Sequence, residues 1–158
     1  MSDAIAPRLE ILQELADRLE QRRADVIEAE AEDIGTPFSA AAMEMDMAVS
    51  HLRTMTLEVP EVEGKAPYGT VAAILPYDAP PVMVARVGGA AILGGHQFRF
   101  SCPSQTPRTA RLFAEVVAGL PGFTAAGSAS PLPPSAAGSV VGASAHPTRV
   151  FRPGSHRA

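Results

Sequence analysis

The N-terminal part of the chain carries apolar side chains with the period of an α-helix. These side chains recur at intervals of three and four residues: Leu9, Leu12, Ala16, Leu19 and Val26. The spacing gathers them on one face, so it predicts an amphipathic helix that runs to Asp33 with a break near Arg23. Gly35 can adopt the left-handed conformation that commonly follows a helix, so we expect the helix to end there.

A second helical stretch is expected from Ser39 to about Thr56. The apolar residues expected on its buried side are Met43, Met47, Val49 and Leu52. Residues 59–69 are rich in proline, glycine and charged side chains, so they are interpreted as a connection.

The pattern changes after Gly69. Residues 70–75 form a short, continuous apolar run, which is typical of a strand buried on both faces in a parallel sheet. A turn follows, then an apolar helix over residues 82–93, a second strand over 97–101 and a helix over 107–118. The order strand, helix, strand, helix predicts an α/β fold with a parallel sheet and right-handed crossover helices.

Charge and composition divide the chain further. The formal net charge is −4, but residues 1–68 hold 15 acidic and 6 basic residues, whereas residues 69–158 hold 2 and 7. From Gly119 onward, 26 of 40 residues are Ala, Gly, Ser or Pro, so this segment has few large side chains to bury. We therefore expect an N-terminal helical segment (1–58), an α/β unit (59–121) and a low-complexity tail (122–158) that is poorly ordered or ordered by a partner.

Several classes of function conflict with this composition. An acidic chain without a basic stripe interleaved with aromatic residues is not expected to bind nucleic acid. No run approaches the roughly 18 apolar residues of a membrane span, and the N-terminus lacks the apolar core of a secretory signal. Cys102 is the only cysteine and the four histidines have no metal-binding spacing, so neither a disulfide nor a metal site is expected. The composition favours a cytoplasmic protein.

Several short segments resemble, in order, motifs of one family. Residues 68–80 read Y-G-T-V-A-A-I-L-P-Y-D-A-P. They resemble the first nucleotide-domain strand and turn of the aldehyde dehydrogenase superfamily, with its pattern P-x-G-V-x-x-x-I-x-P-W-N-x-P. Residues 88–96 are similar to the family's A-P-A-L-A-A-G-N stretch, and residues 105–121 to the region after its K-P-S-E motif.

The resemblance continues on both sides of this central part. The turn at residues 33–37 is similar to the family's D-x-G-K-P turn, and residues 146–155 look like its H-P-x-x-x-x-x-F-T-G-S with one inserted residue. The resemblance covers residues 8–121 well and residues 122–158 poorly. It implies N-terminal helices followed by a partial Rossmann-like unit, the first part of an enzyme whose catalytic domain has no counterpart in this chain.

The resemblance implies a nicotinamide cofactor, NAD or NADP, and no metal. By position it assigns cofactor contacts to these residues: Ile74, Leu75, Pro76, Tyr77, Ser101, Ser104, Gly154 and Ser155. Ser101 and Ser104 stand where the family has the Lys and Glu that hold the adenosine ribose. Gly154 and Ser155 stand at the G-S that opens the helix facing the pyrophosphate. Serines lack the charge and reach of the family's pair. Arg99 is expected on the opposite strand face or at the next position, so it is not taken as a replacement, and the expected cofactor binding is weak or absent.

The resemblance assigns no catalytic residue to this chain. Asp78 stands at the family's oxyanion-hole Asn, but an ionised carboxylate repels an oxyanion to which an amide would donate. Cys102 falls at the K-P-S-E motif rather than at the position of the family's nucleophile, so it is interpreted as a structural thiol. The family's nucleophilic Cys and general-base Glu have no counterpart here.

Three functions stay open at this point. The first is a truncated, non-catalytic relative, or pseudoenzyme, whose parent chemistry is NAD(P)-dependent oxidation of an aldehyde to an acid. The second is a subunit of a split oxidoreductase, and the third is an interaction module that docks on a larger complex. We also expect association with another polypeptide or with a second copy, because a short parallel sheet leaves apolar surface around residues 71–75 and 98–100, beside an open edge.

Overall fold

The computed structural model describes residues 4–126. Three helices form its N-terminal part: α1 (Ile5–Gln21), α2 (Arg23–Ile34) and α3 (Phe38–Arg53). The predicted break near Arg23 is confirmed, and so is the end at Gly35, which has a φ of 74° and donates its N–H to the carbonyl of Ala31 at 3.0 Å. A short helix, η1 (Met55–Glu58), follows α3, and another, α4 (Val59–Val62), occupies the start of the predicted connection.

The buried face of α3 differs in part from the predicted one: Leu52 is buried as expected, and Val49 packs against the core. Met43 and Met47 are 59% and 50% exposed, so their assignment to the buried side was wrong. The buried residues are spaced by four, three and four positions: Ala41, Met45, Ala48 and Leu52. The small side chains of Ala41 and Ala48 let α3 approach the helical segment that follows β1, with which it is in contact.

The α/β fold is confirmed. The strands β1 (Thr70–Ile74), β2 (Gln97–Ser101) and β3 (Phe123–Ala125) form a sheet in the order β1-β2-β3, with every pair parallel. β1 is joined to β2 by one continuous helical segment: α5 (Pro80–Met83), the π-helical turn η2 (Val84–Gly88) and α6 (Gly89–Leu93). β2 is joined to β3 by α7 (Pro107–Val117). The third strand was not predicted, and it extends the sheet past residue 121.

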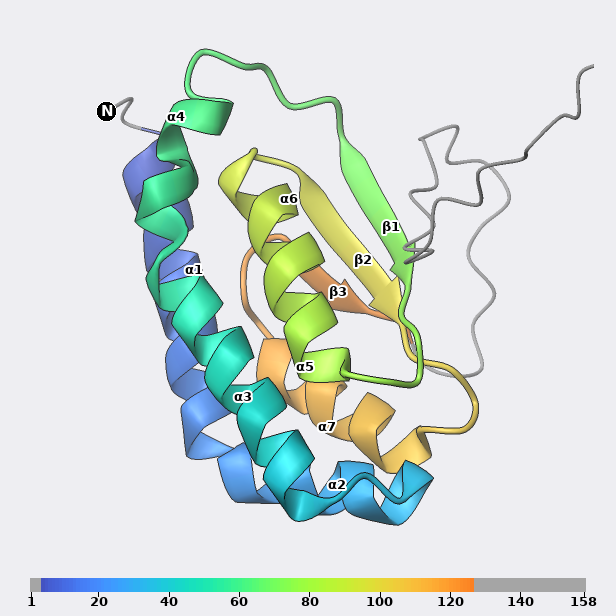
Figure 1. The fold of residues 1–158 in the computed structure, drawn as a ribbon. Coiled ribbons are helices and arrows are strands. Elements are labelled where there is room, and N and C mark those ends of the chain that lie inside the picture. Colours follow the sequence, from blue (N-terminus) through green and yellow to red (C-terminus); the bar gives the residue numbers. More distant parts are fainter. Residues whose placement is uncertain (1–3, 127–158) are drawn as a thin grey trace, which may run out of the picture.

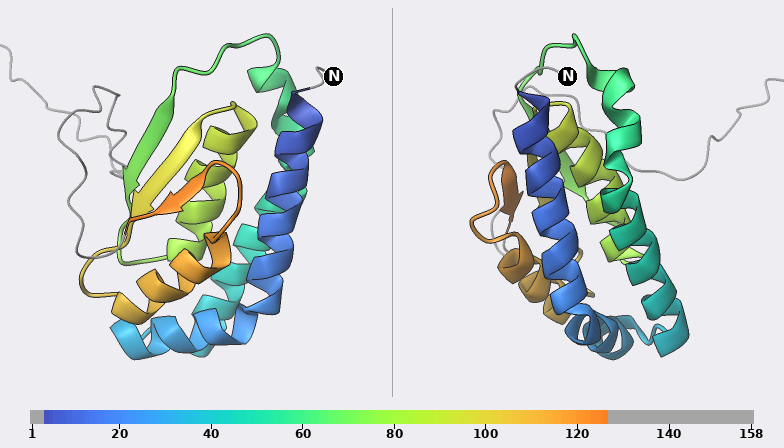
Figure 2. Two further views of the ribbon diagram at one scale, coloured as in Figure 1. Left: turned by 180° about the vertical axis from the view of Figure 1, so that it is seen from behind. Right: turned by 90° about the vertical axis from the view of Figure 1, so that its left-hand side faces the viewer.

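The elements form three layers (Figure 1). The sheet is one layer, and the helices that connect its strands lie on it as the second. The N-terminal helices make the third layer: α1 and α3 contact the α5–α6 segment, and α2 contacts α7. Figure 2 shows α1 and α3 running side by side on the outside of this arrangement.

One face of the sheet is part of the core. The side chains that point to the crossover helices are buried on all three strands: Val71, Ala73, Phe98, Phe100 and Phe123. The ring of Phe98 lies 5.5 Å from that of Phe100 and 5.9 Å from that of Phe123, between centroids. Gly88 lets the helix approach these rings, because a Cβ there would lie 2.9 Å from Phe98 and Phe123 atoms.

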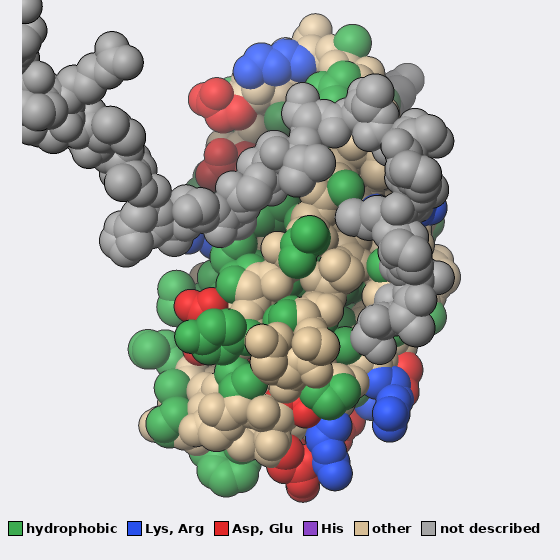
Figure 3. Space-filling model, turned by 90° about the vertical axis from the view of Figure 1, so that its right-hand side faces the viewer, with side chains coloured by type: hydrophobic (Ala, Val, Ile, Leu, Met, Phe, Trp, Pro, Cys, Tyr) green, Lys and Arg blue, Asp and Glu red, His purple; other side chains and the backbone are tan. Residues whose placement is uncertain are grey.

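No helix of residues 4–126 covers the opposite face, here called the open face, so within these residues the prediction of a strand buried on both faces is wrong. Its residues are small or polar apart from one: Thr70, Ala72, Ile74, Gln97, Arg99 and Thr124. We expected residues 71–75 and 98–100 to leave apolar surface exposed. Ile74 does so, being 64% exposed, whereas the large side chains of Phe98 and Phe100 lie on the covered face. Figure 3 views the molecule from the right-hand side of Figure 1, and hydrophobic and uncharged atoms make up most of the middle of that view. No helix within residues 4–126 is long and apolar enough to cross a membrane.

Candidate functional site at the carboxyl edge of the sheet

The carboxyl ends of β1 and β2 lie next to each other. Ile74 is paired with Ser101, and the N–H of Leu75 donates to the carbonyl of Ser101 at 2.9 Å. The loop after β1 and the loop after β2 therefore leave the sheet at the same edge. In open α/β sheets this edge is where ligands bind.

The predicted cofactor residues are divided by their burial. Ile74 and Tyr77 are 64% and 58% exposed. The side chain of Leu75 is in the core, so only the backbone of this residue is available to a ligand. Ser101 is half-buried at the end of β2, and Ser104 is exposed in the loop that follows. Ile74–Tyr77 and Ser101 are thus brought together at one edge.

The remaining predicted site residues are Asp78, Gly154 and Ser155. Gly154 and Ser155 fall outside the described residues. Asp78 is exposed in the turn before α5, where the next residue, Ala79, has the left-handed φ of 50°.

Arg99 lies on the same open face as Ser101, because residues two apart in a strand point to the same side. Its expected place on the opposite face was wrong. Strand alternation alone, counted from Ser101, would have located this basic side chain beside the candidate site.

Cys102 is the first residue of the loop after β2, and it is buried. Burial raises the pKa of its thiol to about 11, and the Asp33 carboxylate adds to the shift. A thiol with this pKa stays protonated at neutral pH, and only the thiolate is a good nucleophile. The interpretation of Cys102 as a structural thiol agrees with this environment.

The loop after β2 is held by the N-terminal helices. Asp33, in the last turn of α2, accepts hydrogen bonds from the backbone N–H groups of Thr109 at 2.8 Å and Arg108 at 3.3 Å. It thus caps α7, while the hydroxyl of Thr106 donates to the carbonyl of Pro103 at 3.1 Å. The predicted start of α7 at Pro107 is confirmed, but the side chain of Thr106 makes no cap hydrogen bond, and the cap comes from a residue more than 70 positions away.

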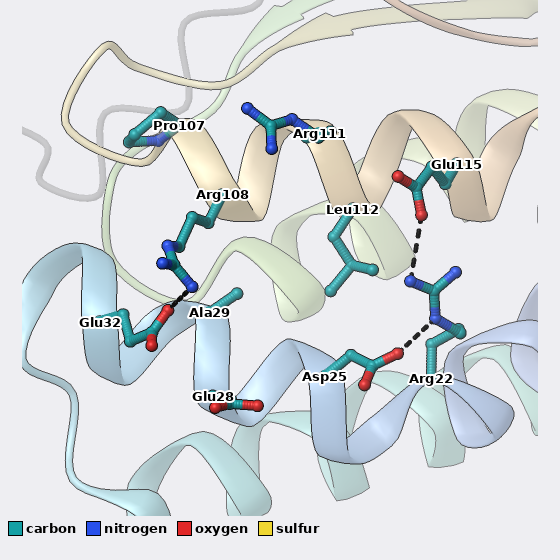
Figure 4. Close-up of a pocket in the computed structure, with 10 residues that line it drawn as sticks. All are labelled: Arg22, Asp25, Glu28, Ala29, Glu32, Pro107, Arg108, Arg111, Leu112 and Glu115. Atoms are coloured by element: carbon teal, nitrogen blue, oxygen red, sulfur yellow. Dashed lines mark hydrogen bonds and ion pairs between the residues drawn. The ribbon is translucent and has the colours of Figure 1, made fainter.

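A groove of about 590 Å³ runs between α2 and α7 (Figure 4). Ion pairs cross it: Arg22 contacts Asp25 at 2.6 Å and Glu115 at 3.0 Å, and Arg108 contacts Glu32. These ion pairs connect the helical layer to α7, and the charged side chains of Glu28 and Arg111 also line the groove. Within residues 4–126, no group of three or more His, Cys, Asp or Glu side chains is placed to hold a metal ion.

Comparison with known proteins agrees with the order of motifs. A model of the aldehyde dehydrogenase family matches residues 4–125. The chain belongs to the aldehyde dehydrogenase family. No curated protein matches it in sequence.

Solved structures of aldehyde dehydrogenases have the same fold. The succinate-semialdehyde dehydrogenase from Burkholderia pseudomallei is 25% identical with a TM-score of 0.68, and the match covers 80% of this chain and 30% of that one. The succinic semialdehyde dehydrogenase from Streptococcus pyogenes, in complex with NADP+, is 21% identical with a TM-score of 0.68, covering 79% and 31%. The salicylaldehyde dehydrogenase from Pseudomonas putida G7 is 21% identical with a TM-score of 0.68, covering 80% and 30%. The chain therefore spans just under a third of the length of these aldehyde dehydrogenases.

The candidate edge fits an aldehyde dehydrogenase cofactor only in part. The ends of β1 and β2 lie next to each other at this edge, and Ile74 is exposed there. Ser101 and Ser104 offer hydroxyls but no charge where the family pattern has Lys and Glu. The charged side chains close to these positions in the sequence are Arg99 and Asp78, and both are exposed.

Proposed function

We propose that this chain is the nucleotide-fold part of an aldehyde dehydrogenase system and does not oxidise aldehydes by itself. The parent reaction is the NAD(P)-dependent oxidation of an aldehyde to an acid. The observation that carries the proposal is the burial of Cys102, the only thiol in the sequence, in the loop after β2.

The parent chemistry requires a nucleophile that this chain does not present. A thiolate must reach the aldehyde carbonyl, and donors must then stabilise the oxyanion that forms. Cys102 is protonated and enclosed, and the carboxylate of Asp78 cannot donate to an oxyanion when ionised. The nucleophile and the general base therefore come from another polypeptide or from further sequence of a longer protein.

Cofactor binding by the chain alone is proposed to be weak. Backbone groups at the ends of β1 and β2 support contact with a dinucleotide, but two serines replace the charged pair that holds the ribose. We expect dissociation constants of about 1 mM or weaker for NAD and NADP, which corresponds to roughly −4 kcal/mol.

A partner polypeptide is the second part of the proposal. Ile74 and Tyr77 are exposed beside the open sheet face, and β1 is an edge strand whose outer backbone groups have no strand neighbour within residues 4–126. Such an edge pairs readily with another chain. The split-enzyme alternative, in which a partner supplies Cys and Glu, is favoured over a docking module by the family membership of residues 4–125.

An activity assay tests the central proposal. The purified 158-residue chain and its Cys102→Ser variant are incubated with NAD or NADP and aliphatic and aromatic aldehydes, and reduced cofactor is followed by absorbance. We expect no turnover from either protein. Turnover by the wild-type chain that Cys102→Ser abolishes would show that Cys102 is a nucleophile, and the proposal would be wrong.

Calorimetry separates the alternatives. Titration of the chain with NAD and NADP is expected to show binding no tighter than about 1 mM. Micromolar binding would contradict the weak-binding part and favour a functional cofactor-binding subunit. Arg99→Ala is the matched variant. It removes the basic group nearest in sequence to Ser101 from the open face and leaves the core unchanged.

A further inference from the structure

Two acidic side chains meet inside the interface of α2 and α3. Glu30 on α2 is 1% exposed, and neither of its carboxyl oxygens has a hydrogen-bond partner. The Oε2 atom of Glu44 on α3 is also buried without a partner. Two buried carboxylates without a cation are strongly unfavourable, so such a pair holds a proton in preference to ionising fully.

The cations of the surrounding helices are engaged elsewhere. Arg23 contacts Asp46 on α3 at 2.7 Å and Glu20 on α1 at 3.8 Å, and it donates to the carbonyl of Ala42. The other charged groups of α2 and α7 are Asp33, which caps α7, and six residues that line the groove between the two helices: Asp25, Glu28, Glu32, Arg108, Arg111 and Glu115. The pKa of Glu30 is raised to about 8, first by burial and then by the carboxylate of Glu44. No basic group opposes these two causes.

The position of Glu30 connects this pair to the candidate site. Its own carbonyl accepts a hydrogen bond from the N–H of Thr36 at 3.4 Å, within the cap of α2. Asp33 follows three residues later, caps α7 and lies close enough to Cys102 to raise its pKa. The last turn of α2 thus contacts α3 on one side, and α7 and the loop after β2 on the other.

We propose that Glu30 and Glu44 form a proton-dependent lock on the last turn of α2. While the pair holds a proton, α2 packs on α3 and Asp33 caps α7. When the proton leaves to solvent, two buried negative charges repel each other, the last turn of α2 loosens, and the start of α7 loses its cap. The lock makes the loop after β2 sensitive to pH independently of any catalytic role of the chain.

The sign of the effect follows from the pKa of Glu30 in the two states. Its pKa is about 8 in the folded chain and near the ordinary 4.5 when unfolded, so folding takes up a proton. The stabilisation is fully present below pH 4.5, declines as the pH rises, and is lost once the pH exceeds about 8.

Urea unfolding of the 158-residue chain between pH 5.5 and 8.5 tests the lock. The unfolding equilibrium constant of the wild-type chain is expected to rise at least ~10-fold more over this range than that of Glu30→Gln, whose neutral amide cannot ionise. The matched control is Glu28→Gln, an exposed acid on the same helix, which should keep the wild-type pH dependence. Equal pH dependence in wild type and Glu30→Gln would overturn the proposal.

Two further measurements keep the test independent of one variant. Glu44→Gln removes the neighbouring charge, so its loss of stability is expected to level off at a lower pH than in wild type. Hydrogen exchange, corrected for the intrinsic effect of pH, should show that the amides of Arg108 and Thr109 lose protection as the pH rises in wild type and keep it in Glu30→Gln. Protection that stays constant with pH in the wild-type chain would show that the pair does not act on α7.

Discussion

The two faces of the sheet differ in the size, polarity and burial of their side chains. On the covered face, Phe98, Phe100 and Phe123 are buried against the crossover helices. On the open face, the neighbouring positions along the same strands hold Gln97, Arg99 and Thr124, all exposed. A parallel sheet is normally covered on both sides, so the comparison shows a fold whose layers are complete on one side only within residues 4–126.

The difference teaches where the stability of this chain resides. The covered face is continuous with the core formed by the N-terminal helices, so a change there disturbs all three layers. The open face contributes alternating polar side chains and the carboxyl edge with the candidate site. Substitutions on the two faces should therefore separate folding from binding.

The largest expected effect is from Phe98→Ala on the covered face. The ring is fully buried between two other aromatic rings, so its removal leaves a large cavity and should cost about 3–5 kcal/mol of unfolding free energy. Urea denaturation measures the change. Arg99→Ala, one position along the same strand and exposed, is the control and should change stability by less than about 0.5 kcal/mol. Similar losses in both variants would show that the open face is covered in solution.

Gly88→Ala sharpens the comparison on the helix side. The added Cβ would lie 2.9 Å from the Phe98 and Phe123 rings, so we expect a loss of about 1–3 kcal/mol from overpacking. Gly89→Ala is the matched control, because its Cβ would meet nothing closer than 3.5 Å. There the better helix propensity of alanine should leave stability unchanged or raise it by up to ~1 kcal/mol. Thermal melts that rank the two variants in the opposite order would contradict this packing.

Asp33→Ala removes the cap that the helical layer supplies to α7. Loss of its two hydrogen bonds should cost about 0.5–2 kcal/mol and reduce protection of the first α7 amides in hydrogen exchange. Asp33→Asn keeps an acceptor at this position and should restore most of the loss. If Asp33→Ala leaves the exchange of these amides unchanged, the contact between the layers is not formed in solution.

The smallest expected effect on folding is from Ile74→Lys on the open face. Since the side chain is 64% exposed, stability should change by less than about 0.5 kcal/mol. Self-association, followed by light scattering over a range of concentrations, should fall, because a lysine beside an edge strand opposes pairing. Thr70→Lys, at a polar position of the same face, is the control. A wild-type chain that is already a sharp monomer, with a melting temperature independent of concentration, would contradict the proposed partner surface.

Much of the site was predictable, because its elements are local. The bounds of β2 and α7 follow from alternation and from prolines and glycines at fixed positions, and the pairing of parallel strands then brings Ile74 and Ser101 to one edge. The third strand was missed because Phe123–Ala125 is three residues long, and it is defined by its pairing with β2 rather than by a pattern of its own.

The sequence by itself determined the approximate bounds of the longer helices and of β1 and β2, since a left-handed glycine, a proline or a change of period acts over a few residues. It also determined the family, through motifs kept in order. Only the tertiary structure decided that α3 buries Ala41, Met45 and Ala48 rather than Met43 and Met47. A helix that is apolar on several sides can pack through either set, and the neighbouring helices approach closest over the smaller residues. The tertiary structure likewise decided that Asp33 caps α7 and that Glu30 meets Glu44, since these pairs are distant in sequence and only the packing of the layers brings them together.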